Sequence, residues 1–162
     1  EHGVGSAPWL HELASADALL TQVRAALPED VRLIVTGDHG MINVPLVSRL
    51  FVEDEPDLLA EVAVLAGEGR LRQLMTRRPD AVAARWRDRL GASAWVRTRA
   101  EAIDEGWFGA VSPRLADRFG DVLVAMADDG AVMSRTLPKE VSLVGMHGSL
   151  TPAELDVPLL VD

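Results

Sequence analysis

The sequence VRLIVTGDHGM, residues 31–41, decides the expected fold. Its first six residues are mostly apolar and β-forming, which is the pattern of a strand covered on both faces. A glycine ends the run, and Asp38 and His39 then stand side by side before a second glycine. In open α/β sheets, ligands bind just beyond the carboxyl ends of the strands. The stretch therefore predicts a strand that carries a carboxylate and an imidazole to a ligand site.

A second histidine, His147, lies in a similar setting within the sequence GMHGS, residues 145–149. Carboxylate and imidazole groups suit Zn²⁺, Mn²⁺ or Fe, so Asp38, His39 and His147 are the predicted metal ligands. They could form one catalytic zinc site with an open position or part of a two-metal site. The alternative is an aspartate that caps a turn beside an exposed histidine, with His147 as an ordinary loop residue.

The spacing of apolar residues predicts an amphipathic helix over residues 9–27, ended by Pro28. Helix, short turn, strand and ligand loop together indicate an α/β fold. Residues 56–126 are a candidate inserted α+β subdomain between the two histidine loops. Downstream we expect a hairpin of strands at 61–66 and 71–76, a helix at 79–90 and a strand at 94–97. A short helix capped by Thr98 or its neighbour should run through Glu105, followed by a helical turn at 113–119. The remaining predicted elements are a strand at 121–126 turned by 128–130 into 131–134, a helix starting at Thr151, and a buried strand at 157–161.

Composition limits the classes of function. The 162 residues fit one domain, and the apolar fraction of 48% supports a real core. A formal net charge of −9 argues against binding a nucleic-acid polymer. There are no cysteines, no signal peptide is visible, and no apolar run reaches the roughly 20 residues that a membrane span needs. We therefore expect no membrane association and a cytoplasmic location.

Other polar residues are weaker candidates. The arginine-rich stretch 70–89 could face a phosphate group, but its interleaved acidic residues favour a solvated helix face. His2 and His11 are expected to be solvated. Ser149 follows His147 closely, yet no neighbouring residue in the sequence suggests a base that would activate it. Neither a Walker-type phosphate loop nor a Gly-x-Ser-x-Gly elbow is present.

The segments TGDHGM (36–41), GMHGS (145–149) and PLL (158–160) resemble the type I phosphodiesterase/nucleotide pyrophosphatase family of the alkaline phosphatase superfamily. The resemblance implies an alkaline-phosphatase-like core sheet with flanking helices. It also implies that Asp38 and His39 bind one metal and that His147 binds the other. The implied cofactor is a pair of divalent ions, expected to be zinc, that act on a phosphodiester or nucleotide substrate.

The family pattern is incomplete in this sequence. An N-terminal half with an aspartate ligand and a threonine or serine nucleophile does not precede residue 1. Glu1-His2-Gly3 resembles the last three positions of the family's Asp-x-x-Gly-His-x-x-Gly motif, so the chain is expected to begin immediately after a ligand histidine. We therefore expect a truncated, C-terminal part of such an enzyme. It would have no catalytic residue or other cofactor-binding residue of its own, a weak or empty metal site, no activity in isolation, and a tendency to form a homodimer.

Two alternatives remain open at this point. Sulfatases, phosphonoacetate hydrolases and cofactor-independent phosphoglycerate mutases share the superfamily's metal chemistry. A non-catalytic structural or interaction domain that keeps the hydrolase scaffold would show the same fold without the chemistry.

Overall fold

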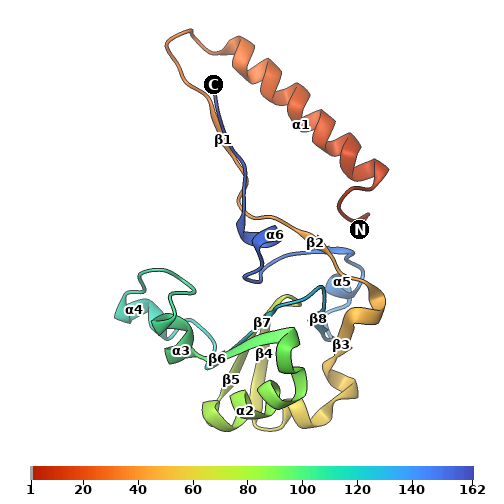
Figure 1. The fold of residues 1–162 in the computed structure, drawn as a ribbon, viewed down its shortest axis with the longest axis vertical. Helices are drawn as coiled ribbons and strands as arrows, with labels where there is room; N and C mark the ends of the chain where they lie inside the picture. The colour runs from red at the N-terminus through yellow and green to blue at the C-terminus, as the bar shows by residue number, and fades with distance from the viewer. Residues whose placement is uncertain (1) are drawn as a thin grey trace.

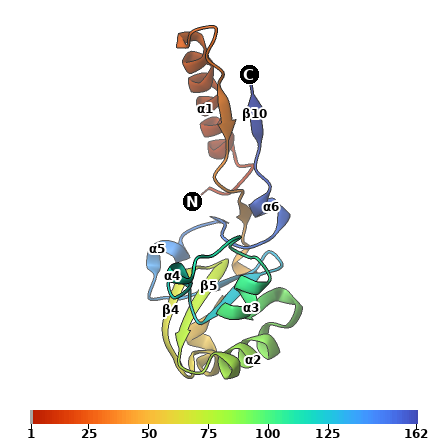
Figure 2. The same ribbon diagram turned by 90° about the vertical axis from the view of Figure 1, so that its left-hand side faces the viewer.

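The computed structural model describes residues 2–162 and consists of a compact body and an extended arm (Figure 1). The arm contains the first helix and a two-stranded ribbon that joins residues from both ends of the chain (Figure 2). The helices are α1 (Ala7–Ala26), α2 (Pro79–Leu90), α3 (Arg99–Asp104), α4 (Pro113–Ala116), α5 (Pro138–Val141) and α6 (Pro152–Leu155), with 3-10 turns η1 (Leu46–Ser48), η2 (Val52–Asp54), η3 (Pro56–Leu59) and η4 (Gly91–Ser93). The strands are β1 (Ile34–Thr36), β2 (Ile42–Asn43), β3 (Arg49–Phe51), β4 (Val62–Glu68), β5 (Leu71–Thr76), β6 (Ala94–Thr98), β7 (Val122–Met126), β8 (Ala131–Met133), β9 (Gly145–Met146) and β10 (Leu159–Val161).

The body is built on a four-stranded antiparallel sheet in the order β4-β5-β7-β6, covered by α2. Alternate residues of β5 are buried, as expected for a strand with one face against a core. Trp86 of α2 is fully buried, and its Nε1 donates to the carbonyl of Leu58 at 2.9 Å. The predicted hairpin at 61–76 and the predicted helix at 79–90 are confirmed.

Local signals at the ends of these elements also act as expected. Pro79 occupies the first turn of α2, and Gly91 ends the helix with a positive φ of 54°. Thr98 caps α3 in a reciprocal capping box with Glu101. Whether residues 56–126 form an inserted subdomain stays a prediction.

The strands predicted at 121–126 and 131–134 both form, as β7 and β8, but the turn between them does not make them partners in a hairpin. β8 instead pairs in parallel with β3, with Leu50 opposite Val132. The physical reason is that β5 and β6 already occupy the two edges of β7, which leaves no hydrogen-bonding edge for another strand.

The expected burial of the strands at 31–36 and 157–161 is also wrong for this chain. β1 and β10 pair only with each other, antiparallel, and their apolar side chains are largely exposed; Ile34 is 60% and Leu159 68% exposed. The predicted helix forms as α1, but none of its residues is buried. Apolar patterns here mark surfaces that residues 2–162 do not cover. No helix among these residues is long and apolar enough to cross a membrane.

Candidate functional site

The two distant histidine loops meet because β2 and β9 pair antiparallel. Ile42 lies opposite Met146, so the residues just before β2 face the residues just after β9. The rings of His39 and His147 consequently stack, with centroids 3.5 Å apart and an interplanar angle of 13°. The structure thus brings together the two imidazoles that the sequence singled out.

Asp38 lies beside the same pair. Its Oδ1 accepts a hydrogen bond from the His39 backbone N–H at 3.0 Å, and its Oδ2 lies 3.7 Å from His39 Nε2. His39 Nδ1 is 2.8 Å from the carbonyl oxygen of Gly40, which can only accept, so Nδ1 is the protonated nitrogen when this bond forms. Nε2 then keeps the lone pair that a metal would need.

Two residues that the sequence did not place in the site line the same cavity as His147. Glu68, at the end of β4, has its Oε2 3.6 Å from His147 Nε2. His2 lines the same cavity of about 980 Å³ as His147, Glu68 and Trp9. His2 is exposed, as expected for a solvated residue, but the Asn43 side chain holds the backbone of Val4 at 2.6 and 3.0 Å, close to β2.

Sequence signals for these residues were unequal. The spacing of His2 and Gly5 also fits His-x-x-Gly of the family motif, in a different alignment from the one that matched Glu1-His2-Gly3 to its last three positions. A signal for His2 was therefore available, and the first alignment missed it. Glu68 belongs to a hairpin strand, and only the folding of that hairpin against the late loop reveals its position. His11 lies in α1, exposed, as expected.

The donor set has the chemistry of a metal site but not the number of converging ligands. Two ligand atoms that are each about 2.1 Å from a shared ion lie within about 4.2 Å of each other, and Asp38 Oδ2 and His39 Nε2 satisfy this condition. Within residues 2–162, however, no three His, Asp, Glu or Cys side chains converge closely enough to hold an ion.

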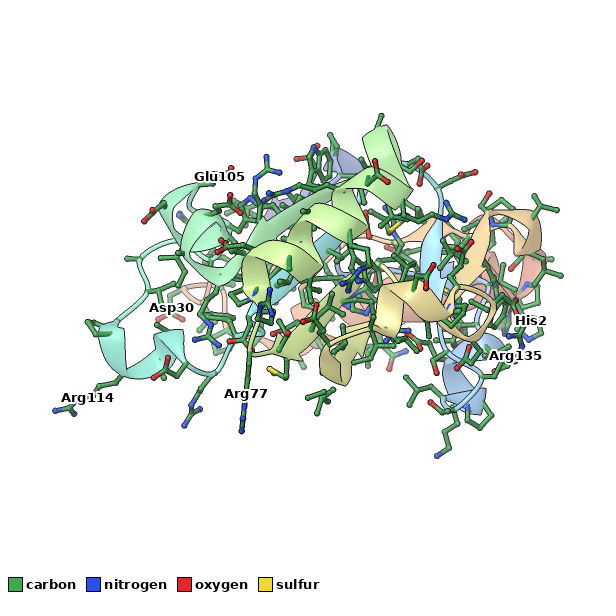
Figure 3. All side chains as sticks on the ribbon, turned by 90° about the horizontal axis from the view of Figure 1, so that it is seen from below. His2, Asp30, Arg77, Glu105, Arg114 and Arg135 are labelled. Atoms are coloured by element: carbon green, nitrogen blue, oxygen red, sulfur yellow. The ribbon has the colours of Figure 1, made fainter. Side chains whose placement is uncertain are left out.

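The arginine-rich stretch is not uniformly solvated, which corrects the sequence prediction. Arg70, in the turn just before β5, and Arg72, on β5, are fully buried. Arg70 forms a bidentate pair with the buried carboxylate of Glu154, at 3.0 and 2.7 Å. Arg77, by contrast, extends away from the ribbon, as does Arg114 further along the chain (Figure 3). The alternation of β5 turns Arg72 inward, and the carboxylates of Glu154 and Glu140 neutralise the buried charges of Arg70 and Arg72.

The environment of Glu154 favours its ionised form. Burial by itself raises the pKa of this carboxyl, but hydrogen bonds from Arg70, from the Thr151 hydroxyl and from the Ser149 backbone N–H outweigh burial, so the pKa is lowered. The hydroxyl of Ser149 is buried and donates to the carbonyl of Met126 at 2.6 Å. The Ser149 hydroxyl is therefore not free to act as a nucleophile. This agrees with the sequence, in which no neighbouring residue suggested a base to activate it.

Comparison with known proteins places the fold. Residues 1–150 match the family model of type I phosphodiesterase/nucleotide pyrophosphatase. No curated protein matches the sequence. Among solved structures, murine ectonucleotide pyrophosphatase/phosphodiesterase 5 in an inactive form in complex with AMP has a TM-score of 0.74 at 18% identity. The human protein of the same name gives 0.69 at 15% identity, and phosphonoacetate hydrolase from Sinorhizobium meliloti 1021, in complex with phosphonoformate, gives 0.69 at 17%.

In each of these three comparisons the match covers 99% of this chain and 42% of the solved chain. The likeness confirms the predicted fold class, a truncated alkaline-phosphatase-like α/β fold with flanking helices. The match of the family model covers both histidine loops, whose rings stack in the structure. The chain belongs to the type I phosphodiesterase/nucleotide pyrophosphatase family.

Proposed function

We propose that this chain contributes part of the two-metal site of a phosphodiesterase or nucleotide pyrophosphatase. Asp38 and His39 would bind one divalent ion, and His147 would bind the other. The observation that carries the proposal is the 3.5 Å stacking of two imidazoles that come from opposite ends of the chain. Family membership supports the same assignment.

The residues fit zinc as an incomplete ligand set. Structural and catalytic zinc sites normally have three or four protein ligands, and this chain offers two to one ion and one to the other. Two further donors lie in this part of the chain: Glu68 Oε2, 3.6 Å from His147 Nε2, and His2, which lines the same cavity as His147. When bound, divalent ions in such sites polarise phosphoryl oxygens and stabilise the attacking and leaving oxygens. We propose that the isolated chain binds zinc weakly.

The proposed substrates carry a phosphodiester or phosphoanhydride bond, and nucleotides are the preferred class. The cavity beside His147, at about 980 Å³, lies in the size range of small-molecule sites, and Trp9 offers an aromatic surface to a base. The TM-score for the phosphonoacetate hydrolase equals that for the human pyrophosphatase, so the fold likeness alone does not separate phosphonates from phosphodiesters.

We also propose that the nucleophile comes from outside these residues. Ser149 carries the hydroxyl nearest to His147 in the sequence, and this hydroxyl donates a hydrogen bond to the carbonyl of Met126. The isolated chain should then fail to hydrolyse a chromogenic phosphodiester. Turnover by the pure chain that a chelator abolishes would contradict this part of the proposal.

Zinc binding is tested by thermal melts with and without Zn²⁺, because a ligand that binds only the folded state raises Tm. We expect a small stabilisation that His39→Ala and His147→Ala each reduce and that His11→Ala, on exposed α1, leaves unchanged. Absence of any shift in the parent chain would favour the alternative, a structural or interaction domain that keeps the hydrolase scaffold.

We further propose that isolated copies form a homodimer through the arm. Large apolar side chains are exposed on both of its parts, including Leu13 at 53% and Leu19 at 60% on α1 and Leu159 at 68% on β10. Contiguous exposed apolar surface and an unpaired strand edge both favour association. Sedimentation should show a dimer that Leu159→Lys weakens; a monomer at high concentration would contradict the proposal.

A further inference from the structure

The side chain of Glu154 is bonded to the loop that carries His147. Its Oε1 accepts from the backbone N–H of Ser149 at 3.1 Å, two residues after His147. Its Oε2 accepts from the Thr151 hydroxyl. The side chain is only 1% exposed, so these bonds form in an environment from which water is excluded.

The backbone of the same residue holds the other histidine loop. The carbonyl of Glu154 accepts from the Gly40 N–H at 2.8 Å, directly after His39. The two segments are in close contact here, because a Cβ added at Gly40 would lie 2.0 Å from the carbonyl oxygen of Ala153. One residue thus contacts both loops, one through its side chain and the other through its main chain.

Glu154 and the two segments that it contacts, residues 38–40 and 147–149, are together called the junction. Arg70 connects this junction to the body of the protein. Its guanidinium donates to both carboxylate oxygens of Glu154 and also to the carbonyls of Asp128 and Gly130, which precede β8. The side chain is completely buried. A planar guanidinium bonded in several directions holds its partner in both position and orientation.

We propose that the Arg70–Glu154 pair is the positioning element that sets the distance between the His39 and His147 loops. Neither residue reaches the imidazoles, so both act through Ser149 and Gly40. The expected effect on the stacking of the two rings depends on geometry alone, whereas the expected effect on metal affinity rests on the proposed function.

A second buried pair supplies a matched control. Arg72, two residues along β5, is also fully buried and pairs with Glu140 at 2.6 Å. Its other acceptors are the carbonyls of Val132 and Gly67, and none of its bonds reaches residues 38–40 or 147–149. Glu140→Gln therefore perturbs a comparable ion pair without touching the junction.

The test uses the four histidines as reporters, since the whole chain contains only His2, His11, His39 and His147. Imidazole NMR spectra of the purified chain should show a nuclear Overhauser contact between the rings of His39 and His147. We expect Glu154→Gln to abolish this contact and Arg70→Lys to weaken it, whereas Glu140→Gln should preserve it. Thr151→Val, which removes a single bond to Glu154, should weaken the contact in a chain that remains folded.

Zinc titration by calorimetry gives the second readout. Loss of a residue that orients metal ligands typically weakens metal affinity by about 10- to 100-fold. We expect this loss for Glu154→Gln and less than a twofold change for Glu140→Gln. If the parent chain does not bind zinc, the proposed function fails, yet the ring contact still tests the positioning role.

The inference is overturned if Glu154→Gln folds, retains the contact between the two rings, and binds zinc as tightly as Glu140→Gln does. If Glu154→Gln does not fold, Thr151→Val decides, and an unchanged ring contact in that variant overturns the inference.

Discussion

Gly40→Ala should separate the two histidine loops, and the structure allows the effect to be sized. An alanine Cβ at this position would lie 2.0 Å from the carbonyl oxygen and 2.9 Å from the carbonyl carbon of Ala153. Both are backbone atoms, so no side chain can rotate away. The two segments must therefore move apart by about 1 Å, taking the ring of His39 with them.

The expected cost combines two effects. Lengthening the bond from the residue 40 N–H to the Glu154 carbonyl costs about 1 kcal/mol, and relieving the overpacking costs about 1–3 kcal/mol. We expect the contact between residue 40 and residues 153–154 to be destabilised by about 2–4 kcal/mol in total. Gly37→Ala is the matched control in the same loop, because its Cβ would meet Val157 and Pro158 at an ordinary 3.6 Å. That variant should change stability by less than about 1 kcal/mol.

Urea unfolding followed by the imidazole NMR signals of His39 and His147 measures the difference. The parent chain and Gly37→Ala should lose the contact between the two rings at similar urea concentrations, and Gly40→Ala should lack it before urea is added. Equal behaviour of the two alanine variants would refute the reasoning, since it would mean that the close approach of Gly40 to Ala153 does not hold the loop.

Three further outcomes follow from the body of the protein. Trp86→Ala should destabilise the chain by about 3–5 kcal/mol, because it empties a fully buried site and leaves the Leu58 carbonyl without its donor; urea denaturation followed by circular dichroism measures this. Thr98→Ala should cost about 1 kcal/mol by removing the capping box with Glu101, and a Thr98→Ser variant should restore most of it. The pKa of Glu154 is lowered from its ordinary value of 4.5 in the folded chain, so as the pH falls the carboxylate of the unfolded chain is protonated first. The ionised carboxylate should therefore contribute its full stabilisation above about pH 4.5, and this contribution should be lost at lower pH. In urea melts at a series of pH values, Glu154→Gln should flatten the dependence of the free energy of unfolding on pH.

Much of the body was predictable because its signals are local. The hairpin at 61–76, α2 between Pro79 and Gly91, and the capping box at Thr98 depend on residues that are neighbours in the chain. The pairing of His39 with His147 was predicted from a resemblance of short motifs, and the pairing of β2 with β9 supplies its geometric basis.

The sequence by itself therefore determined most of the helices and strands of the body and indicated Asp38, His39 and His147 as candidate ligands, because turn chemistry and apolar periodicity depend on short stretches. Only the tertiary structure decided that β8 leaves β7 for β3, that Arg70 is buried against Glu154, and that β1 and β10 remain exposed. These outcomes depend on which edges and faces other parts of the fold already occupy, and local sequence carries no record of that competition.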